Sequence, residues 1–157
     1  MKLQFIGSGS AFTVGTDNYH SNMLLSAEGV DHYLLIDCGT DARHALDAIG
    51  VAYQAVRDVY VSHLHADHAG GLEWLGFITK FDEHCPKPNL YVSDVLVEDL
   101  WCRVLSGGMR SLDQEVAELS SYFNVNLIKQ VQGKQAGGFS WRGVQFELVQ
   151  TRHICDG

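Results

Sequence analysis

The chain has 157 residues, of which 46% are hydrophobic and 19% charged, so it can bury one hydrophobic core and is not a disordered segment. Its formal net charge of −8 disfavours a nucleic-acid partner, because proteins bind phosphate backbones largely through lysine and arginine. No window approaches about 18 consecutive apolar residues, and residues 1–6 leave no room for the apolar region of a signal peptide. We therefore expect a cytoplasmic protein with no membrane partner.

Short runs of alternating apolar residues in the first half of the chain predict a sheet. The predicted strands are 2–6, 23–26, 32–36 and 56–62. A helix is expected over 41–49, where apolar residues share one face and Gly50 supplies a stop signal. A second helix is expected over 70–80, directly after the last of these strands.

The second half of the chain continues the mixed pattern. Strands are predicted at 90–92, 126–132, 139–142 and 144–151, the last two joined around Gly143. Ser93 is a suitable N-cap for a helix that continues to residue 105 and stops at Gly107-Gly108, and an amphipathic helix is predicted over 112–122. This order of elements indicates an α/β or α+β fold, with one layer of helices packed on a sheet in a single domain, 1–157.

Four polar side chains follow the predicted strand 56–62 in close succession. His63 and His65 are two residues apart, so in extended backbone both imidazoles point to the same side and can reach one cation. Asp67 and His68 follow in the turn toward the next helix, and four ligands at this spacing suit two adjacent metal sites better than one. Imidazole and carboxylate ligands suit zinc, iron(II) or manganese, and the absence of cysteine argues against a closed structural zinc site. The alternative is a polar surface loop with incidental histidines.

The motif His63-x-His65-x-Asp67-His68, with Leu35-Ile36-Asp37-Cys38-Gly39 upstream, resembles that of the metallo-β-lactamase-fold hydrolases. Residues 5–12 and 21–25 are similar to the branch that contains ribonuclease Z and metal-dependent phosphodiesterases, including those that cleave cyclic nucleotides. The similarity extends from residue 1 to about residue 80 and resumes near 144–153. It implies an αββα sandwich.

The resemblance also implies roles for individual residues. Two divalent cations are implied, zinc by preference, with manganese or iron as alternatives. Asp67 is the expected proton acceptor, and Asp37 is expected to orient the ligands by hydrogen bonding. The implied ligands are His63, His65 and His153 for the first metal, and Asp67 and His68 for the second.

The chain departs from this family after His153. Family members continue to an aspartate that bridges both metals and to a last histidine, and Asp156 is too close to His153 to match the bridging position. We therefore expect a domain truncated at its C-terminus, with the N-terminal half of the sandwich and part of the second sheet. Such a piece should expose one face of its sheet.

The implied reaction is attack by a hydroxide that bridges the metals. A phosphodiesterase acting on a small anionic phosphodiester, such as a cyclic nucleotide, is the first hypothesis. The alternatives are a tRNA 3′-processing endonuclease like ribonuclease Z, which the acidic charge disfavours, a hydrolase of lactones, esters or thioesters, and a metal-binding module without catalysis. His20, near the expected rim of the site, is a candidate for substrate contact, Tyr19 and Trp74 are candidates for lining the pocket, and a homodimer is expected.

Overall fold

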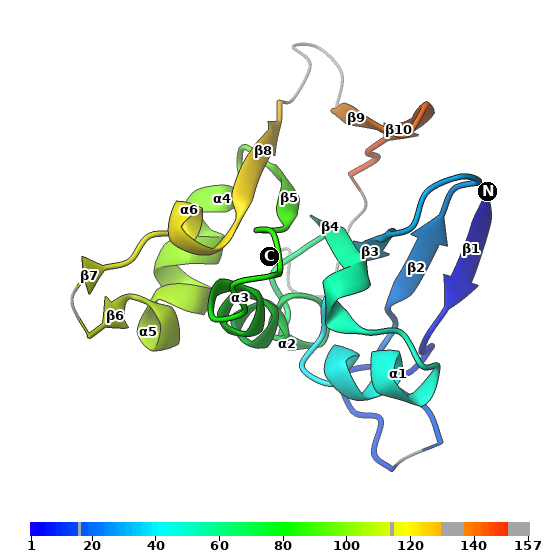
Figure 1. The fold of residues 1–157 in the computed structure, drawn as a ribbon, viewed down its shortest axis with the longest axis horizontal. Coiled ribbons are helices and arrows are strands. Elements are labelled where there is room, and N and C mark those ends of the chain that lie inside the picture. Colours follow the sequence, from blue (N-terminus) through cyan, green and yellow to red (C-terminus); the bar gives the residue numbers. More distant parts are fainter. Residues whose placement is uncertain (16, 114, 130–136, 151–157) are drawn as a thin grey trace.

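A six-stranded sheet forms the centre of the molecule, with strand order β1-β2-β3-β4-β5-β8 (Figure 1). The computed structural model describes residues 1–15, 17–113, 115–129 and 137–150. Strands β1 to β3 pair antiparallel, whereas β3, β4, β5 and β8 are parallel to one another. The bounds are Lys2–Phe5 (β1), Met23–Ser26 (β2), Tyr33–Ile36 (β3), Val56–Val61 (β4), Asn89–Ser93 (β5) and Asn124–Ile128 (β8).

Helices cover one face of this sheet, because each parallel connection needs a crossover that packs back onto it. Apolar side chains of the central strands, such as Leu35, Val59 and Leu90, are fully buried against Leu46 and Leu72 of these helices. Among the described residues, no helix is long and apolar enough to cross a membrane. The helical segments are α1 (Ala42–Ala48), η1 (Tyr53–Ala55), α2 (Ala66–Ala69), α3 (Leu72–Lys80), α4 (Val97–Asp99), the π-helical η2 (Leu100–Leu105), α5 (Ser106–Met109) and α6 (Leu119–Tyr122).

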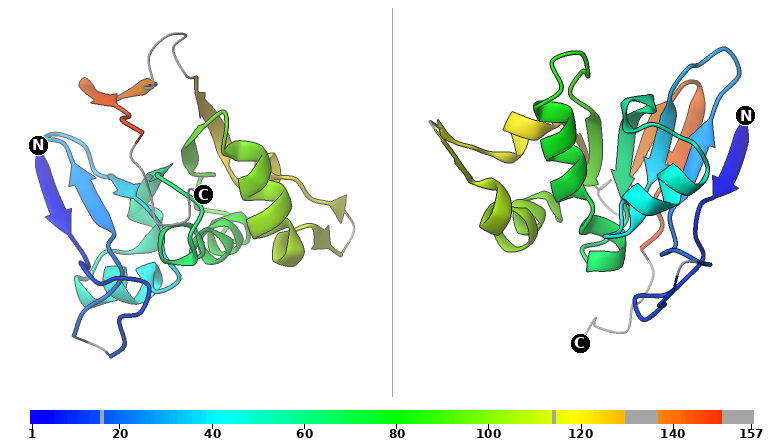
Figure 2. Two further views of the ribbon diagram at one scale, coloured as in Figure 1. Left: turned by 180° about the vertical axis from the view of Figure 1, so that it is seen from behind. Right: turned by 60° about the horizontal axis from the view of Figure 1, so that its bottom comes forward.

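A hairpin of β9 (Gly138–Trp141) and β10 (Val144–Glu147) lies on the opposite face of the sheet from the helices (Figure 2). Its two-residue turn, Arg142-Gly143, has left-handed backbone at both positions, with φ of 49° and 81°, as tight hairpins require. Phe139 stacks on Tyr60 of β4 and Tyr91 of β5, with ring centroids 5.5 and 4.7 Å apart. The hairpin is therefore the start of a second β-layer, in agreement with the predicted mixed α/β architecture.

The edge strand β1 leaves apolar side chains uncovered on this second face. Leu3 pairs in register with Leu25, which packs in the cluster beneath the hairpin, so both lie on the hairpin side of the sheet. Leu3 and Phe5 are 50% and 63% exposed. The sheet is thus partly uncovered at this edge among the described residues.

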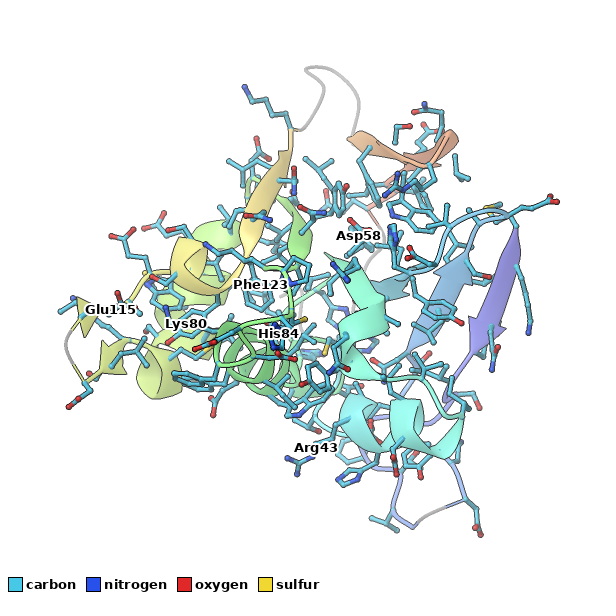
Figure 3. The ribbon with its side chains drawn as sticks, viewed as in Figure 1. Arg43, Asp58, Lys80, His84, Glu115 and Phe123 are labelled. Carbon is cyan, nitrogen blue, oxygen red and sulfur yellow. The ribbon has the colours of Figure 1, made fainter. Side chains whose placement is uncertain are left out.

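The predicted helix over 112–122 is wrong. Only Leu119–Tyr122 (α6) is helical there, and the strands β6 (Ser111–Leu112) and β7 (Glu115–Val116) form a short antiparallel ladder instead. Val116, which the periodic pattern places in the core, is 72% exposed. The ladder is accompanied by a tertiary contact, since Lys80 of α3 forms a 2.9 Å ion pair with Glu115 of β7 (Figure 3).

The predicted limits of the preceding helix are also wrong. Ser93 is the last residue of β5 and not an N-cap, and the helical segments between Val97 and Met109 continue through Gly107-Gly108. Gly108 lies next to the Glu73 carboxylate of α3 and within the helical segment α5, so it does not end the helix. The predicted strands 126–132 and 144–151 extend into residues outside the described ranges.

Candidate metal centre

The predicted metal motif lies where β4 ends, at the carboxyl edge of the parallel strands, which is the usual place for ligand sites in such sheets. The neighbouring strand β3 delivers Asp37 and Cys38 to the same edge. The two loops are joined by the Cys38 N–H, which donates to the His68 carbonyl at 2.7 Å, and by the Gly71 N–H, which donates to the Cys38 carbonyl at 2.8 Å. The fold thus brings the two halves of the predicted site together.

Three of the predicted imidazoles form one cluster. The ring centroid of His63 lies 4.8 Å from that of His65 and 4.0 Å from that of His68. His65 has extended backbone, with φ −64° and ψ 148°, and directly precedes the short helix α2, which carries Asp67 and His68. The change from extended to helical backbone turns the second pair of side chains toward the first.

Asp37 connects these elements through its carboxylate. The residue is 4% exposed and has left-handed backbone, with φ of 62°, which aspartate tolerates better than most residues. Its Oδ1 accepts the Ser62 N–H at 2.8 Å, and its Oδ2 accepts the Ser62 hydroxyl at 2.8 Å and the His68 Nδ1–H at 2.7 Å. Three donors therefore satisfy a buried carboxylate, as such a group requires.

His68 is held in the tautomer that a metal ligand needs. Because a carboxylate only accepts hydrogen bonds, the proton of neutral His68 is on Nδ1, and its Nε2 lone pair faces Asp67 Oδ2 at 3.2 Å. Two acceptors facing each other at this distance favour a cation between or beside them. The hydrogen bond to Asp37 also raises the pKa of His68 above its usual value.

The donor chemistry of Asp67 and His68 fits a divalent cation such as zinc, manganese or iron(II). Within the described ranges, however, no group of three or more histidine, cysteine, aspartate and glutamate side chains is arranged to hold a metal ion. His153, which the sequence predicts as a ligand of the first metal, lies outside the described residues.

His20 lies beside Gly39 and Asp41, near the loop that carries the metal motif. Its backbone N–H donates to Asp41 Oδ2 at 2.9 Å, its Nδ1 lies 3.2 Å from Asp41 Oδ1, and its side chain is 12% exposed. A Cβ placed on Gly39 would touch both His20 Nδ1 and the Asp67 carbonyl. These contacts tie the β1–β2 loop to the start of α1, whereas the predicted contact of His20 with substrate is not tested by them.

Two residues of the site were not predicted from the sequence. Ser62 lies between β4 and His63. Its hydroxyl donates a hydrogen bond to Asp37 Oδ2 and lies 3.0 Å from His63 Nδ1. Asn22 is fully buried and accepts the Gly39 N–H at 2.8 Å. Ser62 could have been identified by its position directly before the motif, but serine there has no distinctive spacing of its own.

An open cavity of about 730 Å³ lies on the helical side of the molecule, between α1 and α3. Trp74, a predicted pocket residue, lines it together with Arg43 and Phe77. None of the four predicted metal ligands that the structure describes, His63, His65, Asp67 and His68, lines this cavity. It is therefore separate from the imidazole cluster.

Comparison with known proteins identifies the family. The model of the family described as anti-Pycsar protein Apyc1 matches residues 1–157. The chain belongs to the Apyc1 family. The Apyc1 of Paenibacillus sp. (strain J14) is 39% identical over 154 residues, covering 98% of this chain and 59% of that protein. The Apyc1 of Bacillus phage vB_BsuM-Goe3 is 34% identical over 153 residues, covering 98% and 58%. The chain thus spans about three fifths of the length of these Apyc1 relatives.

Solved structures confirm the fold of this Apyc1-family chain. Human tRNase Z, short form, superimposes with a TM-score of 0.65 at 20% identity over 90% of this chain and 57% of that one. The metallo-β-lactamase fold protein YhfI of Bacillus subtilis gives a TM-score of 0.59 at 18% identity over 89% and 48%. At these identities the likeness shows the metallo-β-lactamase fold alone.

Proposed function

We propose that this Apyc1-family chain carries the metal centre of a two-metal phosphodiesterase that hydrolyses a small cyclic nucleotide. The observation that carries the proposal is the arrangement of Asp37, His68 and Asp67. Asp37 accepts the proton on His68 Nδ1, so in the neutral ring the Nε2 lone pair faces an Asp67 oxygen at 3.2 Å, and both are donors that suit a divalent cation. Membership of the Apyc1 family and the metallo-β-lactamase fold support a hydrolase acting on cyclic nucleotides.

In this proposal the two cations have separate ligand sets. His63, His65 and His153 hold the first, and Asp67 and His68 hold the second, with zinc the preferred metal and manganese or iron(II) the alternatives. When bound, the cations supply a nucleophile at neutral pH and stabilise charge on the phosphate oxygens. They also offset the chain's net charge of −8, which would otherwise repel an anionic substrate.

The protein residues have their own roles in the reaction. The Asp67 side chain is only 11% exposed and lies beside the imidazole cluster, so it is the proposed proton acceptor. Asp37, whose carboxylate is fixed by three hydrogen bonds, accepts the proton on His68 Nδ1 and so orients that ring. The homodimer expected from the sequence stays a prediction.

The proposal is tested by incubating the full-length protein, since the 157 residues alone are expected to be inactive if they lack the bridging aspartate and the last histidine, with Zn²⁺ or Mn²⁺ and a panel of 3′,5′-cyclic CMP, UMP, AMP and GMP, followed by chromatography of the nucleoside monophosphate products. We expect hydrolysis of at least one cyclic nucleotide. His63→Ala and Asp67→Ala should each lower turnover at least about a hundredfold, the scale of losing one electrostatic stabiliser of a transition state. His84→Ala, at an exposed histidine with no proposed ligand role, is the matched control and should retain full activity.

The other function classes give different outcomes in the same experiment. Hydrolysis of lactones, esters or thioesters without phosphodiester turnover would contradict the proposal, and so would cleavage of a precursor tRNA without cyclic-nucleotide turnover. Metal analysis of the purified chain adds an independent measurement. Binding of metal with no hydrolysis of any substrate would indicate a non-catalytic module, and absence of metal binding would refute the ligand assignment.

A further inference from the structure

The hydroxyl of Ser62 has two partners. Its Oγ lies 2.8 Å from Asp37 Oδ2 and 3.0 Å from His63 Nδ1. A serine hydroxyl carries one proton and can accept two further hydrogen bonds. The direction of both bonds therefore follows from which partner takes the proton.

The carboxylate decides that direction. Asp37 can only accept, so the single Ser62 proton points to Asp37 Oδ2. The contact with His63 is then a hydrogen bond only if His63 Nδ1 is the donor and Ser62 Oγ the acceptor. Neutral His63 consequently has its proton on Nδ1 and its lone pair on Nε2, which is the same tautomer that Asp37 imposes on His68 directly.

We propose that Ser62 is a positioning residue that relays the effect of Asp37 to His63. One buried carboxylate then sets the tautomer of two histidines, His68 through a direct bond and His63 through the Ser62 hydroxyl. This inference rests on the proposed function, which assigns these two histidines to different metals. Asp37 would thereby prepare both metal positions at once.

The relay is fixed by backbone as well as by side chains. The Ser62 N–H donates to Asp37 Oδ1 at 2.8 Å, so serine and aspartate are joined by two bonds, one to each carboxylate oxygen. The Asp37 N–H in turn donates to the Tyr60 carbonyl at 2.8 Å, on the strand that leads to Ser62. The carboxylate cannot rotate away from the hydroxyl without breaking its bonds to the Ser62 N–H and to His68, which is how outer partners of metal ligands keep a ring oriented.

The first experiment measures the His63 tautomer in the metal-free 157-residue chain by long-range ¹H–¹⁵N correlation NMR, at about pH 8, where most imidazoles are neutral. We expect the Nδ1–H form of His63 in the native chain and in Ser62→Thr, which keeps a hydroxyl. Ser62→Ala should shift His63 toward the Nε2–H form and leave His68 unchanged. Ser62 is exposed, so these substitutions should not unfold the chain. Ser106→Ala, which removes a hydroxyl bonded to the Cys102 carbonyl, is the matched control.

The second experiment titrates the same variants with Zn²⁺ in the presence of a competing chelator. Ser62→Ala should weaken Zn²⁺ binding about tenfold, the lower end of the loss seen when an outer partner of a ligand is removed. Ser62→Thr should restore it. An unchanged His63 tautomer and unchanged affinity in Ser62→Ala would overturn the relay. If the native chain bound no Zn²⁺, the proposed metal centre would fail, whereas the tautomer measurement would still decide the role of Ser62.

Discussion

The hydrogen bond between Trp141 and Asp58 should hold the β9–β10 hairpin on the sheet. Asp58 is 3% exposed in the middle of β4, and Figure 3 shows it beneath the hairpin. Its Oδ2 accepts the Trp141 indole N–H at 2.9 Å, and its Oδ1 accepts the Asn89 side-chain amide at 2.8 Å. A buried carboxylate in a sheet is costly unless its oxygens are satisfied in this way.

Replacing Trp141 with phenylalanine removes the indole donor and leaves Asp58 Oδ2 with only the more distant His32 Nε2, at 3.5 Å. A hydrogen bond to a charged group contributes about 1.5–3 kcal/mol, so we expect the free energy of unfolding to fall by about 2 kcal/mol. For a chain of this length that corresponds to a fall in Tm of roughly 4–8 °C. Urea unfolding followed by far-UV circular dichroism measures the change.

Trp74→Phe is the matched control for this prediction. It makes the same truncation at a partly buried tryptophan of α3, whose indole N–H forms no hydrogen bond to a described residue. The excess loss in Trp141→Phe over Trp74→Phe then isolates the hydrogen bond from the loss of ring area. Equal losses in the two variants, within about 0.5 kcal/mol, would show that the bond to Asp58 does not hold the hairpin.

Two further predictions concern metal and thiols. Removing metal with a chelator should abolish cyclic-nucleotide turnover, and adding Zn²⁺ should restore it. Zn²⁺ at a hundredfold its Kd should also raise the free energy of unfolding by about 2.7 kcal/mol, which thermal denaturation measures. An unchanged Tm would contradict binding of Zn²⁺ to the folded state. In the native chain at pH 8, iodoacetamide should modify the exposed Cys102 and spare Cys38, because complete burial raises the pKa of the Cys38 thiol. Peptide mass spectrometry after mild labelling distinguishes the two cysteines.

The strands and the metal motif could be predicted from the sequence because their signals are local. Alternation over four to six residues marks the strands, and the spacing of His63, His65, Asp67 and His68 depends only on the backbone that carries them. The structure brings His63, His65 and His68 into one cluster, as that spacing predicts. The prediction for His153 stays open, since that residue is outside the described ranges.

The wrong helix prediction over 112–122 and the missed role of Ser62 both have non-local causes. The stripe of Leu112, Val116 and Leu119 has helical spacing, yet the pairing of Lys80 with Glu115, 35 positions apart, accompanies a hairpin. Ser62 was missed for the same reason, because its partner Asp37 is 25 positions away and meets it only through the register of β3 with β4. Long-range contacts of this kind leave no periodic trace in the sequence.

The parallel pairing of β3 with β4 explains why Asp37 can serve this site at all. Ile36 of β3 pairs with Tyr60 of β4, so both strands end side by side. Asp37 and Ser62 therefore lie at the same edge of the sheet. The loops that follow must then approach closely, and Gly71 permits this, because a Cβ there would clash with the Gly39 carbonyl oxygen. A bulkier residue at Gly71 would push the β3 loop away from the motif and move Asp37 relative to both Ser62 and His68. The orientation of the proposed ligands is therefore determined by strand register and loop packing, before any metal binds.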